Sequence, residues 1–204
     1  MTRRDHWNTI YTTKGERDVS WFESVPEVSL AMLDAAGLTP DSCVVDIGGG
    51  DSRLVDALLA RGLTCLVVLD VSEAAVERAR RRLGPASATV SWVVSDVTDA
   101  WSVKPMDVWH DRAMFHFLTD PEDRAKYLRH IRQALKLDGS VIIATFALDG
   151  PERCSGLRVV RYSPETLAAT LGDEFELMEA RPYQHVTPWG AGQSLQYSRF
   201  RRRR

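Results

Sequence analysis

Short apolar runs alternate along the chain with segments in which apolar residues recur every three or four positions. The runs at 43–47, 66–69, 90–94, 106–109 and 141–146 are short, and they predict strands buried on both faces. Helices are predicted to begin near Pro26, Leu54, Ser72, Asp120 and Ser163, and to end near Gly37, Gly62, Gly84, Asp138 and Gly172. This alternation predicts a doubly wound α/β fold in which parallel strands are joined by right-handed helical crossovers.

The two ends of the chain depart from this pattern. Segments 175–180 and 195–200 read as strands with no helix between them, which predicts an antiparallel pair at one edge of the sheet. Residues 1–24 are irregular and rich in aromatic side chains, and we expect them to form a lid that packs on the rest. The chain is thus predicted to be a single domain with a lid at 1–24, a core at 25–200 and a basic tail at 201–204.

Composition narrows the classes of partner and compartment. The 204 residues carry a formal net charge of −2, which argues against capture of nucleic acid or of an anionic membrane. Five arginines in the last six positions are the local exception, and we expect this tail to be solvated. Cys43 and Cys65 lie in apolar runs and are expected to be free thiols in a reducing cytoplasm. No signal peptide, membrane-spanning stretch or metal-ligand spacing is visible, so we expect a soluble cytoplasmic protein with no metal.

The segment 44–52, Val-Val-Asp-Ile-Gly-Gly-Gly-Asp-Ser, carries the strongest sign of ligand binding. A strand ends in Asp46 and the glycines 48–50 then turn the chain towards a helix. Glycines at such a turn let a ligand approach the backbone, and the helix start adds free N–H groups. A turn without a ligand is the simpler alternative. Arg53 replaces the third glycine of a dinucleotide fingerprint, which disfavours NAD, and no Walker A lysine follows.

Two further acids close the next two strands. Asp70 follows the apolar run 66–69 and is placed to accept hydrogen bonds from ribose hydroxyls. Asp96 follows the run 90–94, where a carboxylate can accept from an adenine amino group. Either acid alone is more often a helix cap. Three acids on successive strand ends indicate a ligand site, because open α/β sheets bind ligands at that edge.

These segments resemble those of the class I S-adenosylmethionine-dependent methyltransferases, over about residues 26–200. The resemblance rests on Asp46-Ile47-Gly48-Gly49-Gly50, Val68-Leu69-Asp70, Ser95-Asp96-Val97, the segment 106–111 and the segment 135–139. It implies S-adenosylmethionine as cofactor and a seven-stranded sheet with its last strand antiparallel. It also implies that Gly48, Gly49, Gly50 and Asp46 lie by the methionine part, Asp70 and Val71 by the ribose, and Asp96 and Val97 by the adenine. Ser52 stands where many members have a third glycine, and Asp138 stands in a turn that usually reads Pro-Gly-Gly.

The connection after the fourth strand is the candidate site of chemistry. It contains Asp111, Arg112 and His116 beside aromatic residues. Methyl transfer mainly requires alignment and exclusion of water, and a base is needed only when the acceptor must lose a proton. Asp111 or His116 would then be that base, and Arg112 would hold an anionic acceptor. The alternative is that Asp111 braces the loop and His116 packs against its phenylalanine neighbours.

Other candidates for acceptor binding lie outside this connection. They are Tyr11 and Trp21 in the lid, Cys154 and Arg158 after the fifth strand, and His185 between the last two strands. Because little chain remains beyond the core, we expect a small-molecule acceptor with a thiol, amine or hydroxyl. A protein lysine acceptor, a non-catalytic cofactor-binding or scaffold protein, and an oxidoreductase are the alternatives.

Overall fold

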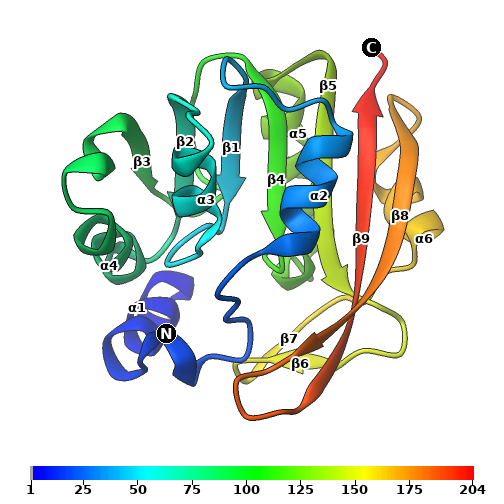
Figure 1. The fold of residues 1–204 in the computed structure, drawn as a ribbon. Coiled ribbons are helices and arrows are strands. Elements are labelled where there is room, and N and C mark those ends of the chain that lie inside the picture. The colour runs from blue at the N-terminus through cyan, green and yellow to red at the C-terminus, as the bar shows by residue number, and fades with distance from the viewer. Residues whose placement is uncertain (1) are drawn as a thin grey trace.

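The computed structural model describes residues 2–204, so the first residue of the predicted 1–24 lid lies outside it. Its centre is a seven-stranded sheet in the order β3-β2-β1-β4-β5-β9-β8 (Figure 1). The strands, in chain order, are β1 Cys43–Ile47, β2 Cys65–Asp70, β3 Val90–Val94, β4 Met106–Arg112, β5 Leu135–Phe146, β8 Phe175–Val186 and β9 Gly192–Arg202. Only β9 runs antiparallel to its neighbours, which confirms the predicted doubly wound sheet with an antiparallel last strand.

Helices cover both faces of the sheet. They are α1 Arg3–Thr13, α2 Glu27–Ala35, α3 Leu54–Ala60, α4 Glu73–Leu83, α5 Pro121–Ala134 and α6 Pro164–Leu171. Short elements complete the chain: 3₁₀ turns at Glu16–Asp18, Gly84–Thr89 and Phe115–Phe117, and a small ribbon of β6 Arg153–Cys154 and β7 Leu157–Arg158. One apolar core joins the sheet to α5 and α6, and a second joins its other face to α2 and α3.

The carboxyl ends of β1, β2, β3 and β4 meet at one edge of the sheet, and α1 lies across that edge (Figure 1). Strand β1 lies between β2 and β4, so the direction of strand order reverses beside it. In open α/β sheets, ligands bind at such a reversal point. The fold therefore directs the search for a site to the ends of β1–β4.

The expectation of an irregular N-terminal segment is wrong for residues 3–13, which form α1. A capping box starts this helix: Thr2 Oγ1 accepts from the Asp5 N–H at 3.1 Å, and Asp5 Oδ2 accepts from the Thr2 N–H at 3.1 Å. Reciprocal capping of this kind satisfies N–H groups that the helix leaves unpaired. The predicted turn at 138–139 lies inside β5, where Asp138 adopts a φ of 60° and the register with β4 shifts between Leu135 and Ser140.

Cys43 and Cys65 form a disulfide, so the expectation that both are free thiols is wrong. They are the first residues of β1 and β2 and are directly paired in the parallel register, with Cα atoms 4.6 Å apart. Cysteine usage therefore no longer argues for a reducing compartment. Between residues 2 and 204, the structure contains no helix with the length and apolar character needed to cross a bilayer.

The arginine tail is only partly solvated, because Arg199 and Arg202 belong to β9 and are half-buried. Arg203 Nε donates to Glu176 Oε2 at 2.7 Å, and Arg202 Nη1 donates to the backbone oxygen of Arg132 at 2.7 Å. These contacts hold the end of β9 against β8 and α5. Exposed pairs of this kind contribute little to stability, because solvent screens them.

Candidate functional site

The turn after β1 is packed so closely that it has no space for side chains at its glycines. Gly48 has a φ of +66° and Gly50 a φ of +40°, and both values favour glycine. A Cβ atom at Gly48 would lie 2.7 Å from Met114 Cβ, and one at Gly50 would lie 2.7 Å from Asp70 Oδ2. The glycines thus let Met114 and Asp70 pack directly against the turn, and Gly48 lines the space at the carboxyl ends of the strands.

The acids after β2 and β3 both face this edge. Asp70 is 6% exposed and accepts from the Ser72 N–H at 2.7 Å. Burial, together with the charge of Asp46, raises the pKa of Asp70 to about 7. Burial alone would raise the pKa of Asp96 as well, but hydrogen bonds from Thr98 and the charge of Arg3 bring it below its usual value. Two carboxylates with different electrostatic surroundings therefore line one crevice.

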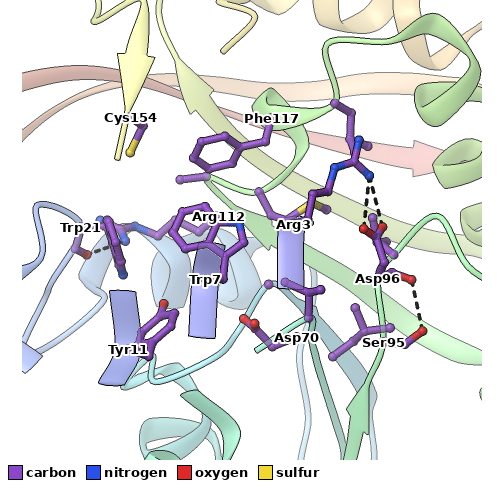
Figure 2. A pocket seen from close by; sticks show the side chains of 17 residues that line it. Arg3, Trp7, Tyr11, Trp21, Asp70, Ser95, Asp96, Arg112, Phe117 and Cys154 are labelled. Carbon is purple, nitrogen blue, oxygen red and sulfur yellow. Dashed lines mark hydrogen bonds and ion pairs between the residues drawn. The ribbon is translucent and has the colours of Figure 1, made fainter. Parts of the chain in front are cut away.

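A cavity with about 780 Å³ of empty space opens between these acids and α1 (Figure 2). In Figure 2, Cys154 lies across the cavity from Asp70. Strand ends, the loop after β4 and the N-terminal segment supply the wall: Arg3, Trp7, Tyr11, Trp21, Gly48, Leu69, Asp70, Val71, Ser95, Asp96, Val97, Arg112, Ala113, Met114, Phe117, Leu118 and Cys154.

A second cavity continues from the first along the glycine turn. Its wall includes Asp46, Gly49 and His110, and it shares Tyr11, Trp21, Gly48 and Arg112 with the first cavity. Of the predicted cofactor-binding residues, all but Gly50 line one cavity or the other. A single extended ligand can therefore reach from Asp96 at one end to Asp46 at the other, past the shared residues.

Aromatic side chains of the N-terminal segment close the first cavity. The Trp7 ring lies 5.7 Å from that of Trp21 and 5.1 Å from that of Phe117, both edge to face. Arg3 joins α1 to the sheet edge, with Nη1 3.2 Å from Asp96 Oδ2 and an ion pair to Asp123. The predicted lid residues Tyr11 and Trp21 thus lie in the cavity wall, as Figure 2 shows.

Arg112 lies in the wall of both cavities, but its donors are bound to the protein. Nε donates to Tyr197 Oη at 3.0 Å, Nη1 donates to the backbone oxygen of Trp21 at 2.8 Å, and Nη2 lies 2.8 Å from Glu23 Oε1. The guanidinium therefore fixes the segment around Trp21. It is a poor candidate for binding an anionic acceptor, because Glu23 already balances its charge.

Asp111 and His116 are both fully buried and line neither cavity. Asp111 accepts from the N–H groups of Met114 and Phe115 at 3.0 and 3.1 Å and from Tyr127 Oη at 2.7 Å. The His116 ring packs 4.8 Å from that of Phe146. Burial lowers the pKa of His116 to about 3. The structure thus gives Asp111 the bracing role and His116 the packing role that the sequence left open as alternatives.

Of the three remaining acceptor candidates, one lines a cavity and two do not. Cys154 lines the first cavity, and burial raises the pKa of its thiol. Arg158 is exposed on β7 and His185 is buried at 2% exposure, and neither is in a cavity wall. Instead, His185 Nε2 lies 2.6 Å from the backbone oxygen of Ser20 and holds the N-terminal segment in place.

Sequence reasoning missed three groups of site residues. Arg3 contacts Asp96 from α1, and the sequence of α1 has no apolar stripe from which this helix could be predicted. Met114 and Leu118 line the cavity from the loop after β4. They are apolar loop residues, and the sequence pointed only to their charged neighbours as site residues. His110 pairs with Asp46 at 2.7 Å because the two residues are partners in the β1–β4 register, a relation that only the fold reveals.

Comparison with known proteins decides the class. Residues 44–139 match a family model described as a methyltransferase domain. The chain carries a class I S-adenosylmethionine-dependent methyltransferase domain. No curated protein matches it in sequence.

Solved structures share the fold of this methyltransferase at low identity. A 1,6-didemethyltoxoflavin-N1-methyltransferase of Burkholderia thailandensis is 20% identical, with a TM-score of 0.71, and the match covers 98% of this chain and 84% of that one. The N-methyltransferase NodS of Bradyrhizobium japonicum is 18% identical, with a TM-score of 0.69 and coverages of 87% and 96%. A match at 17% identity and a TM-score of 0.76 comes from a complex between the Haloferax volcanii Trm112 methyltransferase activator and a methyltransferase, with coverages of 100% and 98%.

Proposed function

We propose that the two cavities together hold S-adenosylmethionine. The buried carboxylate of Asp70 accepts from the ribose hydroxyls, Asp96 lies beside the adenine, and Asp46 faces the amino group. The position of Gly48 in the walls of both cavities supports this placement, because a ligand there can approach its backbone. The bound cofactor supplies an activated methyl group on a sulfonium, so the protein has only to align the acceptor and exclude water.

We further propose that the acceptor is a small, largely apolar molecule with a nitrogen nucleophile. The aromatic wall of Trp7, Trp21 and Phe117 carries this conclusion. The arginines of that wall are already paired, Arg3 with Asp96 and Arg112 with Glu23, which leaves no free positive charge there for an anion.

The same wall bears on the kind of nucleophile. Within residues 2–204, no histidine lines the first cavity, and its two carboxylates lie on the side assigned to the cofactor. An alcohol needs a base to remove its proton, whereas a neutral amine or ring nitrogen presents a lone pair directly. Two of the structurally similar proteins are named as N-methyltransferases, which agrees with this choice. A protein lysine is disfavoured because α1 covers the cavity.

Two experiments test the proposal. Isothermal titration with S-adenosylhomocysteine and with NAD should give binding for the first alone. A screen with isotope-labelled cofactor should then find label in small aromatic amines or ring nitrogens, while matched alcohols and a lysine-rich protein stay unlabelled. Binding of NAD alone would overturn the cofactor site, and transfer confined to alcohols or to protein would overturn the acceptor class.

A further inference from the structure

Buried polar side chains connect the glycine turn to the N-terminal segment through the apolar core. His110 Nδ1 lies 2.7 Å from Asp46 Oδ1, and His110 Nε2 lies 2.9 Å from Ser29 Oγ. Ser29 Oγ approaches Tyr197 Oη at 3.5 Å, the longest step, and Tyr197 Oη accepts from Arg112 Nε at 3.0 Å. We call this series from Asp46 to Arg112 the polar chain.

The two ends of the polar chain are compatible with one direction of the hydrogen bonds along it, in which His110 Nε2 accepts. Arg112 has only donors, so Tyr197 accepts there and its own hydroxyl hydrogen points to Ser29. Ser29 then donates to His110 Nε2, and the hydrogen on Nδ1 points to Asp46 Oδ1, which accepts it. One consistent arrangement thus satisfies every member, although Ser29 and Tyr197 are fully buried and His110 is 2% exposed.

Both ends of the polar chain lie at the site. Asp46 lines the second cavity, and Arg112 lines both and binds the backbone oxygen of Trp21 and the carboxylate of Glu23. His185 binds the adjacent backbone oxygen of Ser20. In the middle of the polar chain, Ser29 and Tyr197 line neither cavity. Burying these polar groups costs desolvation free energy, and packing alone recovers little of it. Because both ends lie at the site, this cost points to a role beyond stability.

We propose that the polar chain couples cofactor binding at Asp46 to the closed position of residues 19–25, with His110, Ser29 and Tyr197 as positioning residues. The proposal rests on the proposed placement of the cofactor amino group at Asp46. An ammonium group bound there holds the Asp46 carboxylate towards His110, which stabilises this direction of the hydrogen bonds and hence the Arg112 geometry that holds Trp21. The segment that walls the acceptor side then closes when the cofactor is present.

The test breaks the polar chain in its middle. Tyr197→Phe removes one hydroxyl and keeps the ring, and Ser29→Ala breaks the neighbouring step from α2. Each variant should bind S-adenosylhomocysteine about three- to tenfold more weakly, the range of one lost hydrogen bond. In each variant, S-adenosylhomocysteine should also no longer slow amide hydrogen exchange in residues 19–25. Ser198→Ala is the matched control, because it removes a buried hydroxyl from the next residue of β9, on the opposite face of the sheet.

A double-mutant cycle separates coupling from a merely structural role. Combined with Asp46→Asn, the effect of Tyr197→Phe on affinity should largely disappear, whereas independent sites would give additive losses. Wild-type affinity and wild-type exchange protection in folded Tyr197→Phe would overturn the proposal, as would strict additivity. Failure of the wild-type protein to bind S-adenosylhomocysteine would instead overturn the cofactor placement itself, so the two failures are distinguishable.

Discussion

Asp70 illustrates at the scale of one residue how a binding group weakens the fold that carries it. Burial beside Asp46 raises its pKa to about 7. An aspartate whose pKa is higher folded than unfolded favours the fold at low pH, and this contribution is lost as pH rises from about 4 to about 7. We therefore expect Asp70→Asn to be more stable than the wild type at pH 8, yet to bind S-adenosylhomocysteine more weakly by about 1.5–3 kcal/mol.

Urea unfolding at pH 5 and pH 8 and isothermal titration measure these two effects. Asp96→Asn provides a control of opposite sign, because the pKa of Asp96 is lowered and its ionised form stabilises the fold at neutral pH. Ligand donors at the ribose prefer the ionised Asp70, so wild-type affinity should also rise between pH 6 and pH 8. Equal stability of wild type and Asp70→Asn at pH 8 would contradict the argument.

His116 tests whether a base takes part in the reaction. Burial and the nearby Arg112 lower its pKa to about 3, so the ring is neutral and weakly basic at working pH. We expect His116→Gln to turn over within about twofold of the wild-type rate, whereas loss of a general base costs on the order of 10²–10⁴. Steady-state rates at saturating substrate, with thermal unfolding to show that the variant is folded, decide between these outcomes.

At the scale of elements, α1 converts an open strand edge into an enclosed cavity. Removal of residues 2–20 should leave the sheet folded, because its cores are built from other elements, and should abolish turnover. Trp7→Ala should reproduce most of this loss, since Trp7 lines the cavity, while Arg4→Ala on the exposed face of α1 should not. Circular dichroism monitors the fold and labelled-cofactor transfer monitors turnover. A truncated chain with full activity would remove α1 from the mechanism.

The same elements show what the sequence can and cannot reveal. The acid–glycine turn after β1 and the acids at Asp70 and Asp96 were predictable, because each depends on a local strand-to-loop pattern. Helix α1 was missed because its order comes from a cap and from distant contacts such as Arg3 with Asp96. The pairing of Asp46 with His110 depends on the register of β1 with β4, and nothing local encodes that register.

At the scale of the whole molecule, the disulfide and the site lie at opposite ends of the same strands. Cys43 and Cys65 begin β1 and β2, whereas Asp46 and Asp70 lie near the ends of these strands. Opening the bond by reduction, or in Cys43→Ser, should lower stability by about 3 kcal/mol for a closed loop of this length. We expect the affinity for S-adenosylhomocysteine to stay within about twofold, because the backbone register of both strands holds the site.

Denaturant unfolding with and without dithiothreitol measures the loss, and titration under the same two conditions measures the affinity. Cys154→Ser serves as the control, because the Cys154 thiol is free. Dithiothreitol should lower the stability of this variant by the same amount as that of the wild type. A large loss of affinity on reduction would show that the strand ends are less rigid than their pairing indicates.

The placement of β9 between β5 and β8 has a consequence for synthesis. β8 is made before β9, yet β9 is its partner in the sheet. Until residues 192–202 have paired, β5 presents an unpaired backbone edge, and the second half of β5, residues 141–146, is largely apolar. Open edges of this kind pair readily with other chains. We therefore expect a chain truncated after residue 186, which lacks β9, to aggregate more during expression than the 204-residue chain.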